Sequence, residues 1–126
     1  MTHPAADGVL LVDKPAGISS HAVVEHARRA IGTRRIGHGG TLDPFATGLL
    51  VLLVNRATRL LPFLDGEPKL YRARISFGAR TATDDCDGEV VEERGMPSHE
   101  AVERAILTLT GNLLQRPPAF SAKSVG

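Results

Sequence analysis

One acidic side chain, Asp43, stands in a glycine-rich segment that is typical of an active-site loop. Residues 37–48 read GHGGTLDPFATG, with four glycines in twelve positions. Glycine lets a backbone turn tightly and approach a ligand closely, and Pro44 disfavours the helical region for the residue before it. A carboxylate aimed in this way can act as a base, a nucleophile or an ion-pair partner. The structural alternative is a simple Asp-Pro turn.

The same segment fits neither of the common nucleotide-binding motifs. A P-loop needs Lys followed by Ser or Thr after its last glycine, and Thr41-Leu42 stands there instead. The dinucleotide fingerprint needs a third glycine or alanine where Leu42 stands. His38, on the same loop, has two interpretations: it stacks on or replaces a base, or it makes a hydrogen bond within the loop. The residues alone leave both open.

Two other clusters of polar residues do not predict chemistry. Residues 83–88, TDDCDG, are acidic, but their glycine comes too early for a calcium loop, so a polar loop with an Asp-Gly turn is expected. His21 and His26 miss the four-residue spacing of zinc ligands on one helix. Cys86 lies among aspartates, whose charge would raise the pKa of its thiol. We therefore expect neither a metal site nor a thiol nucleophile.

Charge is unevenly distributed although the net charge is only +1. Residues 1–82 hold 11 Lys and Arg against 6 Asp and Glu, whereas residues 83–126 hold 4 against 8. A basic cluster beside the loop indicates an anionic partner such as a phosphate backbone, and its alternative is a solvated arginine face. The cluster consists of Arg28, Arg29, Arg34 and Arg35.

Length and composition indicate one cytoplasmic domain. The chain has 126 residues, of which 42% are apolar, and no apolar run is long enough to cross a membrane. Its first residues lack the pattern of a signal peptide. The single cysteine excludes an internal disulfide and fits a reducing compartment.

The elements that must position the loop follow from the apolar periodicity. Helical and strand patterns mix without a regular βαβ alternation, which predicts an α+β fold with a mixed, largely antiparallel sheet and flanking helices. The central strand is expected just after the loop, in the most hydrophobic stretch. The predicted elements are a strand at 8–13, a helix from Ser19 or Ser20 to Ala30, strands at 34–36 and 49–54, a short helix at 57–64, strands at 70–77 and 88–93, and a helix from Ser98 to Thr110.

The sequence resembles the bacterial TruB-type tRNA pseudouridine synthases. GHGGTLDPFATGLL is similar to the signature loop of that family, and a T-x-T-x-D-x-x-G pattern at 81–88 favours the stand-alone bacterial enzymes over guide-RNA-dependent relatives. The resemblance implies the pseudouridine synthase fold and an isomerase that converts the T-loop uridine at position 55 of tRNA to pseudouridine. Similar segments in the same order are VDKPAGISSH at 12–21, RATRL at 56–60, YRARISFGARTATDDCDG at 71–88 and QRPPAFSA at 115–122.

The resemblance also assigns roles to individual residues. Asp43 matches the catalytic aspartate, Tyr71 the tyrosine that stacks on the target base, and His38 the histidine that replaces the flipped nucleotide in the T loop. Lys14 matches the lysine of a Lys-Pro pair near the site, with a mainly structural role. With residues of the glycine-rich loop and the basic cluster added, we expect Asp43 as the catalytic residue, Tyr71, His38, Lys14, Gly40 and Thr41 at the substrate, and Arg34 and Arg35 at the RNA backbone.

The implied reaction needs no cofactor. It breaks the bond from C1′ to N1, turns the uracil and rejoins it through C5, without redox change or an energy source. The uridine must first leave its stack, at a cost of a few kcal/mol, which stacking on Tyr71 can partly offset. Asp43, as an ionised carboxylate, then either attacks C1′ or removes the 2′ proton, and the sequence leaves both routes open.

Members of the family extend beyond the segment that resembles this chain. They carry a further catalytic portion, whose arginine pairs with the catalytic aspartate, and an RNA-binding PUA-type domain. Residues 1–126 are therefore expected to be the N-terminal part of a catalytic domain, with little activity alone. Where the family pattern places a lysine, this chain has Ser124, with Lys123 one residue earlier.

The expected partner is the T stem-loop of tRNA, bound by a monomer with neither a membrane nor a protein partner. Two alternatives stay open: an RNA-binding fragment without catalysis, and a synthase that acts on another RNA. An unrelated carboxylate hydrolase is disfavoured because the sequence offers no second well-placed acid.

Overall fold

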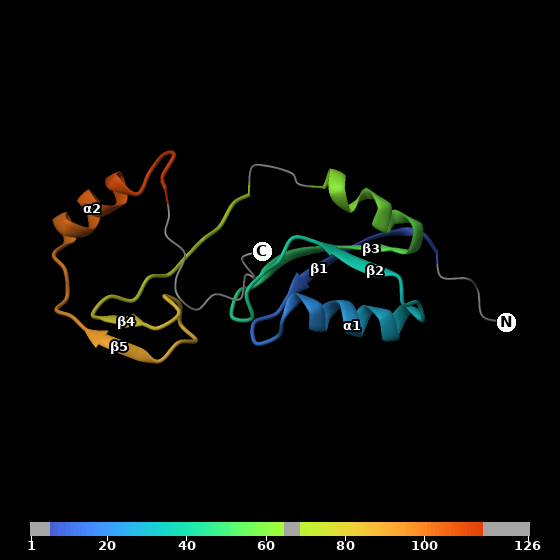
Figure 1. Ribbon diagram of the computed structural model, residues 1–126, viewed down its shortest axis with the longest axis horizontal. Coiled ribbons are helices and arrows are strands. Elements are labelled where there is room, and N and C mark those ends of the chain that lie inside the picture. Colours follow the sequence, from blue (N-terminus) through green and yellow to red (C-terminus); the bar gives the residue numbers. More distant parts are fainter. Residues whose placement is uncertain (1–5, 65–68, 115–126) are drawn as a thin grey trace. The chain divides into compact units, whose positions relative to one another are not determined.

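The computed structural model describes residues 6–64 and 69–114. The chain divides into two compact units, Met1–Leu70 and Tyr71–Gly126, whereas its length alone predicts one domain. Helices and antiparallel strands are both present (Figure 1), which confirms the α+β prediction. Within the described residues, no helix has the length and apolar character needed to cross a membrane.

A three-stranded antiparallel sheet forms the centre of the first unit. Its strands are β1 (Gly8–Lys14), β2 (Ile36–Gly39) and β3 (Gly48–Val54), in the order β1-β3-β2. The central position predicted for the stretch after the loop is confirmed. β3 pairs on both sides, and three of its apolar residues are almost completely buried: Leu50, Leu52 and Leu53.

One face of this sheet is covered by the helix α1 (Ser20–Ile31) (Figure 1). Side chains alternate across a strand, so Leu50 and Leu52 of β3 face the same side and pack with Val23 and Val24 of α1. The helix begins as predicted, because the hydroxyl of Ser19 accepts the backbone N–H of Ala22 at 3.1 Å. It ends at Gly32, whose φ of 75° is left-handed.

The predicted short helix at 57–64 is present as a 3₁₀-helix, η1 (Asn55–Phe63), drawn in green in Figure 1. The sequence predicts that the glycine-rich loop starts at Gly37, and this is wrong, because Gly37–Gly39 belong to β2. The contacts of η1 with this strand explain the difference. A Cβ at Gly37 would lie 2.7 Å from Leu61 Cδ1, and one at Gly39 would lie 3.4 Å from Leu64 Cδ1. These glycines therefore let η1 and the residue after it approach the strand closely.

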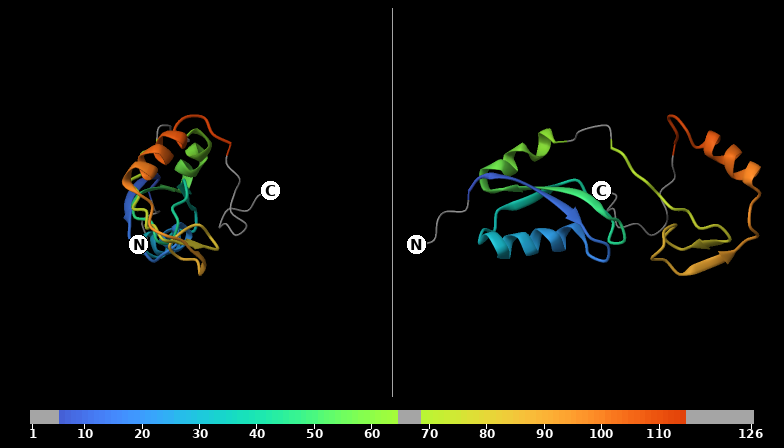
Figure 2. Two further views of the ribbon diagram at one scale, coloured as in Figure 1. Left: turned by 90° about the vertical axis from the view of Figure 1, so that its left-hand side faces the viewer. Right: turned by 180° about the vertical axis from the view of Figure 1, so that it is seen from behind.

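The second unit contains a small antiparallel sheet and a helix (Figure 2, right). The strands are β4 (Ala79–Thr81) and β5 (Val90–Glu93), and the helix is α2 (His99–Thr108), capped by Ser98 as predicted. The strand predicted at 70–77 is wrong. Residues 71–77 form no strand and are exposed, because an alternating pattern becomes a strand only where a neighbouring strand pairs with it.

Candidate active site

Asp43 lies in the first unit, at the start of a turn between β2 and β3. Its carbonyl accepts the backbone N–H of Ala46 at 3.0 Å, which closes a four-residue turn with Pro44 in the second position. The residue is exposed. In the part of the chain that the structure describes, its carboxylate makes no hydrogen bond or ion pair. The side chain is thus presented to solvent by a backbone that is itself held.

The residue before Asp43 is fixed by a buried serine. The hydroxyl of Ser20 accepts the N–H of Leu42 at 3.0 Å and donates to the carbonyl of Leu42 at 3.1 Å. Ser20 is only 3% exposed, and Leu42 packs against the core beneath α1. Both backbone groups of Leu42 are therefore satisfied by one side chain, which comes from the first turn of the helix.

The residue after Asp43 is fixed by the connection between β1 and α1. The carbonyl of Pro44 accepts the N–H of Gly17 at 2.8 Å and the ammonium of Lys14 at 3.1 Å. Lys14 is fully buried and donates two further bonds, to the carbonyls of Ile18 at 2.7 Å and Pro15 at 2.9 Å. The ammonium of Lys14 therefore ties the Lys-Pro turn to the Asp43 turn.

His38 lies in β2, opposite Leu52, and is half-buried. Its Nδ1 donates to the carbonyl of Gly40, so the hydrogen bond within the loop is present. The φ of Gly40 is 106°, a conformation that favours glycine. Because a carbonyl can only accept, Nδ1 carries the N–H in this hydrogen bond, and Nε2 is an acceptor when the ring is neutral. Thr41 is exposed and follows directly.

The expected site residues are divided between the two units. Asp43, His38, Lys14, Gly40 and Thr41 belong to the first unit; a hydrogen bond joins His38 to Gly40, and Lys14 reaches the Asp43 turn through the carbonyl of Pro44. Tyr71 is the first residue of the second unit, where it is 69% exposed in a segment without regular structure.

The two arginines expected at the RNA backbone face different surroundings. Arg35 donates from Nε to the hydroxyl of Thr58 in η1 at 3.1 Å. Arg34 lines an open pocket of about 570 Å³ at the end of α1, together with Arg28 and Arg29. Both Arg34 and Arg35 precede β2 whereas Asp43 follows it, and a four-residue strand spans roughly 13 Å. A ligand that touches these arginines and Asp43 must therefore be extended.

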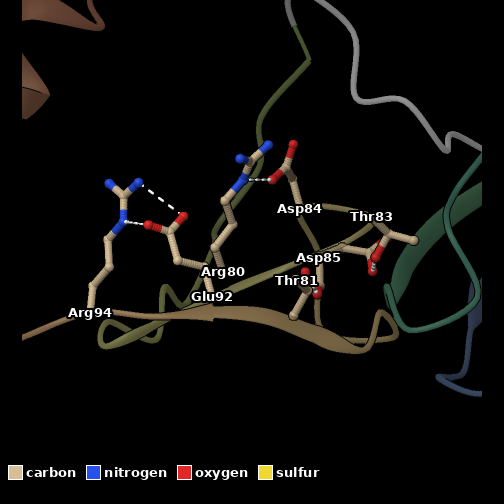
Figure 3. A network of polar contacts seen from close by, with 7 residues as sticks. All are labelled: Arg80, Thr81, Thr83, Asp84, Asp85, Glu92 and Arg94. Atoms are coloured by element: carbon tan, nitrogen blue, oxygen red, sulfur yellow. Dashed lines mark hydrogen bonds and ion pairs between the residues drawn. The ribbon is translucent and has the colours of Figure 1, made fainter.

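In the second unit, one carboxylate organises the T-x-T-x-D-x-x-G segment (Figure 3). An oxygen of the Asp85 carboxylate accepts the hydroxyl of Thr83 at 2.6 Å and the N–H of Asp87 at 2.9 Å. The hydroxyl of Thr81 donates to the carbonyl of Asp85 at 2.7 Å. A Cβ at Gly88 would lie 2.2 Å from the hydroxyl oxygen of Thr83. All four residues of the pattern thus close one loop, a role that the sequence alone did not reveal.

This hydrogen bonding lowers the pKa of Asp85 below its ordinary value of 3.8, with the bond from Thr83 as the main cause. Cys86 behaves as the sequence predicts: partial desolvation first, and then the charge of Asp87, raise the pKa of its thiol.

Beside the loop, Arg80 pairs with Asp84 at 3.1 Å, and Arg94 binds both oxygens of Glu92 (Figure 3). The Arg94 hydrogen bond lowers the pKa of Glu92.

We expect Thr83→Val to raise the pKa of Asp85 toward 3.8. A carboxyl group whose pKa is lower in the folded state stabilises that state above its unfolded pKa, and this stabilisation disappears as the pH falls through the folded pKa. Acid should therefore weaken the second unit below about pH 3.8, and less so in the variant. A carbon-13 NMR titration of the Asp85 carboxyl measures this, with Thr108→Val in α2 as the control. An unchanged pKa would contradict the described bond.

Comparison with known proteins shows the family to which the chain belongs. Residues 28–126 match the family model of the TruB family pseudouridylate synthases, N-terminal domain. The chain therefore belongs to the TruB family of pseudouridylate synthases. The match includes the loop that carries Asp43, so Asp43 lies within the domain that characterises the family.

The relatives are named tRNA pseudouridine synthase B. The chain is 52% identical over 122 residues to the protein of Thermobifida fusca, covering 95% of this chain and 42% of the relative. It is 48% identical over 120 residues to that of Aquifex aeolicus, covering 94% and 42%. The chain thus spans about two-fifths of the length of these relatives.

Among solved structures, the chain is similar to one chain of the "Structure of H/ACA RNP bound to a substrate RNA containing 2'-deoxyuridine". The match covers 44% of this chain and 18% of the chain in that structure, at 41% identity and with a TM-score of 0.43. The family assignment depends on the sequence matches.

Proposed function

We propose that this chain is the N-terminal part of the catalytic domain of a tRNA pseudouridine synthase and supplies the catalytic aspartate, Asp43. The observation that carries the proposal is the position of Asp43 in the family's loop, exposed and fixed through both neighbouring residues. The relatives named tRNA pseudouridine synthase B support tRNA as the substrate. From the resemblance we propose the T-loop uridine at position 55 as its target.

In this proposal the target uridine is flipped out of the T loop before reaction. Tyr71 stacks on the flipped base and His38 occupies the vacated position. Asp43 attacks C1′ or removes the 2′ proton. In the first route the bond from Asp43 to C1′ replaces the C1′–N1 bond and breaks again as C5 bonds to C1′; in the second route the proton taken by Asp43 returns to C2′. In both routes the C1′–N1 bond breaks, a C1′–C5 bond forms, the C5 proton leaves and N1 gains a proton.

The proposal includes a cation that pairs with the Asp43 carboxylate. Among the described residues, no cation pairs with it. Removal from water at a bound base disfavours the charged form of a carboxylate unless a cation or donors face it. By resemblance, an arginine in a following catalytic portion has this role. The same proposal gives a cytoplasmic monomer that needs no protein partner and no cofactor.

The experiment joins this chain to the remaining three-fifths of the Thermobifida fusca relative and assays tritium release from T stem-loop RNA labelled at C5 of uridine. The joined protein is expected to release tritium, and the chain alone little or none. Salt-dependent RNA binding without release would instead favour the RNA-binding fragment. Efficient release by the chain alone would refute the proposed division of the domain.

Arg34 tests the contact with the RNA backbone. We expect Arg34→Gln to weaken binding of the T stem-loop uniformly and to reduce the slope of log K against log salt by about 0.7–0.9, the loss of one phosphate contact. Fluorescence anisotropy over a salt series measures the slope. Arg104→Gln in α2 is the control, because it removes the same charge from a helix of the second unit. Equal slopes in the Arg34 variant and the wild type would remove Arg34 from the interface.

A further inference from the structure

Two consecutive serines at the start of α1 make different bonds. Ser19 is exposed and caps the helix through the N–H of Ala22. Ser20 is buried and does not cap the helix, since its hydroxyl bonds to Leu42 as acceptor of the N–H and donor to the carbonyl. Sequence patterns treat either serine as a possible cap, so the contact across 22 residues is a property of the fold.

The Ser20 contact acts on the loop at the residue next to the candidate catalytic carboxylate. Figure 1 shows the start of α1 and the connection from β2 to β3 at the same end of the sheet. The loop contains a left-handed glycine, Gly40, so its own backbone restricts it little. The paired bonds of Ser20 fix the position and the orientation of the Leu42 peptide groups, and the second of these groups leads directly into Asp43.

We propose that Ser20 is a positioning residue for Asp43. It touches neither the RNA nor the reacting atoms, and it acts by holding the Leu42 backbone so that the carboxylate meets the sugar carbon in the reactive orientation. The catalytic part of this inference rests on the proposed function of Asp43. The structural part, a loop held by Ser20 and not by Ser19, stands independently.

The structural part is tested on the 126-residue chain by hydrogen exchange. Ser20→Ala removes the acceptor of the Leu42 N–H, so the protection of this amide should fall by about tenfold or more. Ser20→Thr keeps the hydroxyl and should restore most of the protection. Ser19→Ala removes the helix cap and should leave Leu42 protected. If Ser19→Ala and Ser20→Ala lower Leu42 protection equally, the loop depends on the helix as a whole and the proposal is overturned.

The catalytic part is tested in the joined protein by comparing kcat with KM for the T stem-loop. Misplacement of a reacting group lowers the rate of the chemical step far more than binding. Ser20→Ala should lower kcat by about 10- to 100-fold and change KM by less than about twofold, and Ser20→Thr should recover kcat. An unchanged kcat with unprotected Leu42 would refute positioning. If the unmodified joined protein is inactive, the proposed function fails while the exchange result still decides the structural claim.

Discussion

Replacing Asp43 by Asn is expected to abolish pseudouridine formation, with a fall in kcat of at least about 10³-fold. A carboxamide of nearly equal shape can neither attack C1′ with a negative oxygen nor accept the 2′ proton. Because the side chain is exposed and makes no bond within the described residues, the substitution leaves the loop contacts intact. Chromatography of nucleosides from digested RNA measures the loss in the joined protein.

The control for this prediction is Glu103→Gln in α2, which removes one exposed negative charge from the second unit. It should retain wild-type turnover, and both variants should bind the T stem-loop within about threefold of the wild type. Turnover by the Asp43→Asn variant within tenfold of the wild type would mean that another residue performs the reaction.

Replacing Lys14 by Met is expected to destabilise the first unit by about 2–4 kcal/mol. The substitution keeps much of the side-chain volume but removes the three hydrogen bonds of the ammonium, leaving the carbonyls of Pro15, Ile18 and Pro44 without this donor. Full burial of Lys14 prevents water from replacing it without rearrangement. Urea unfolding followed by circular dichroism measures the change.

Lys69→Met provides the comparison for Lys14, because Lys69 is exposed in the structure. Its stability should stay within about 0.5 kcal/mol of the wild type. If Lys14→Met were equally harmless, the three bonds of the ammonium would contribute little, and the Asp43 turn would be held by Gly17 and Ser20 alone.

The elements predicted correctly are those with strong local signals. The apolar run of β3 and the capped, periodic sequence of α1 determine their structures largely by themselves. The strand predicted at 70–77 is wrong because pairing depends on neighbours, which a local alternation does not specify. The position of Gly37 in a strand could not be predicted for a similar reason. Its close approach to Leu61 is a tertiary contact, which leaves no pattern in the neighbouring sequence.

The candidate site shows the same division. Glycine content and the Asp-Pro step indicate Asp43 from the sequence, and the resemblance supplies its role. The partners that hold the loop could not be predicted, because Ser20 and Leu42 are far apart in the chain and a buried serine looks like a helix cap. The loop around Asp85 had only its repeating Thr and Asp pattern as a signal.

The proposed function requires that Asp43 of this chain isomerise a T-loop uridine. This is tested by mapping pseudouridine in a complete tRNA transcript, by carbodiimide modification and reverse transcription, after incubation with the joined protein. We expect a single stop, one nucleotide to the 3′ side of position 55, with the joined protein that carries Asp43, and none with Asp43→Asn. A stop reporting pseudouridine at position 55 that persists in the Asp43→Asn variant, or modification confined to other positions, would contradict the proposed function.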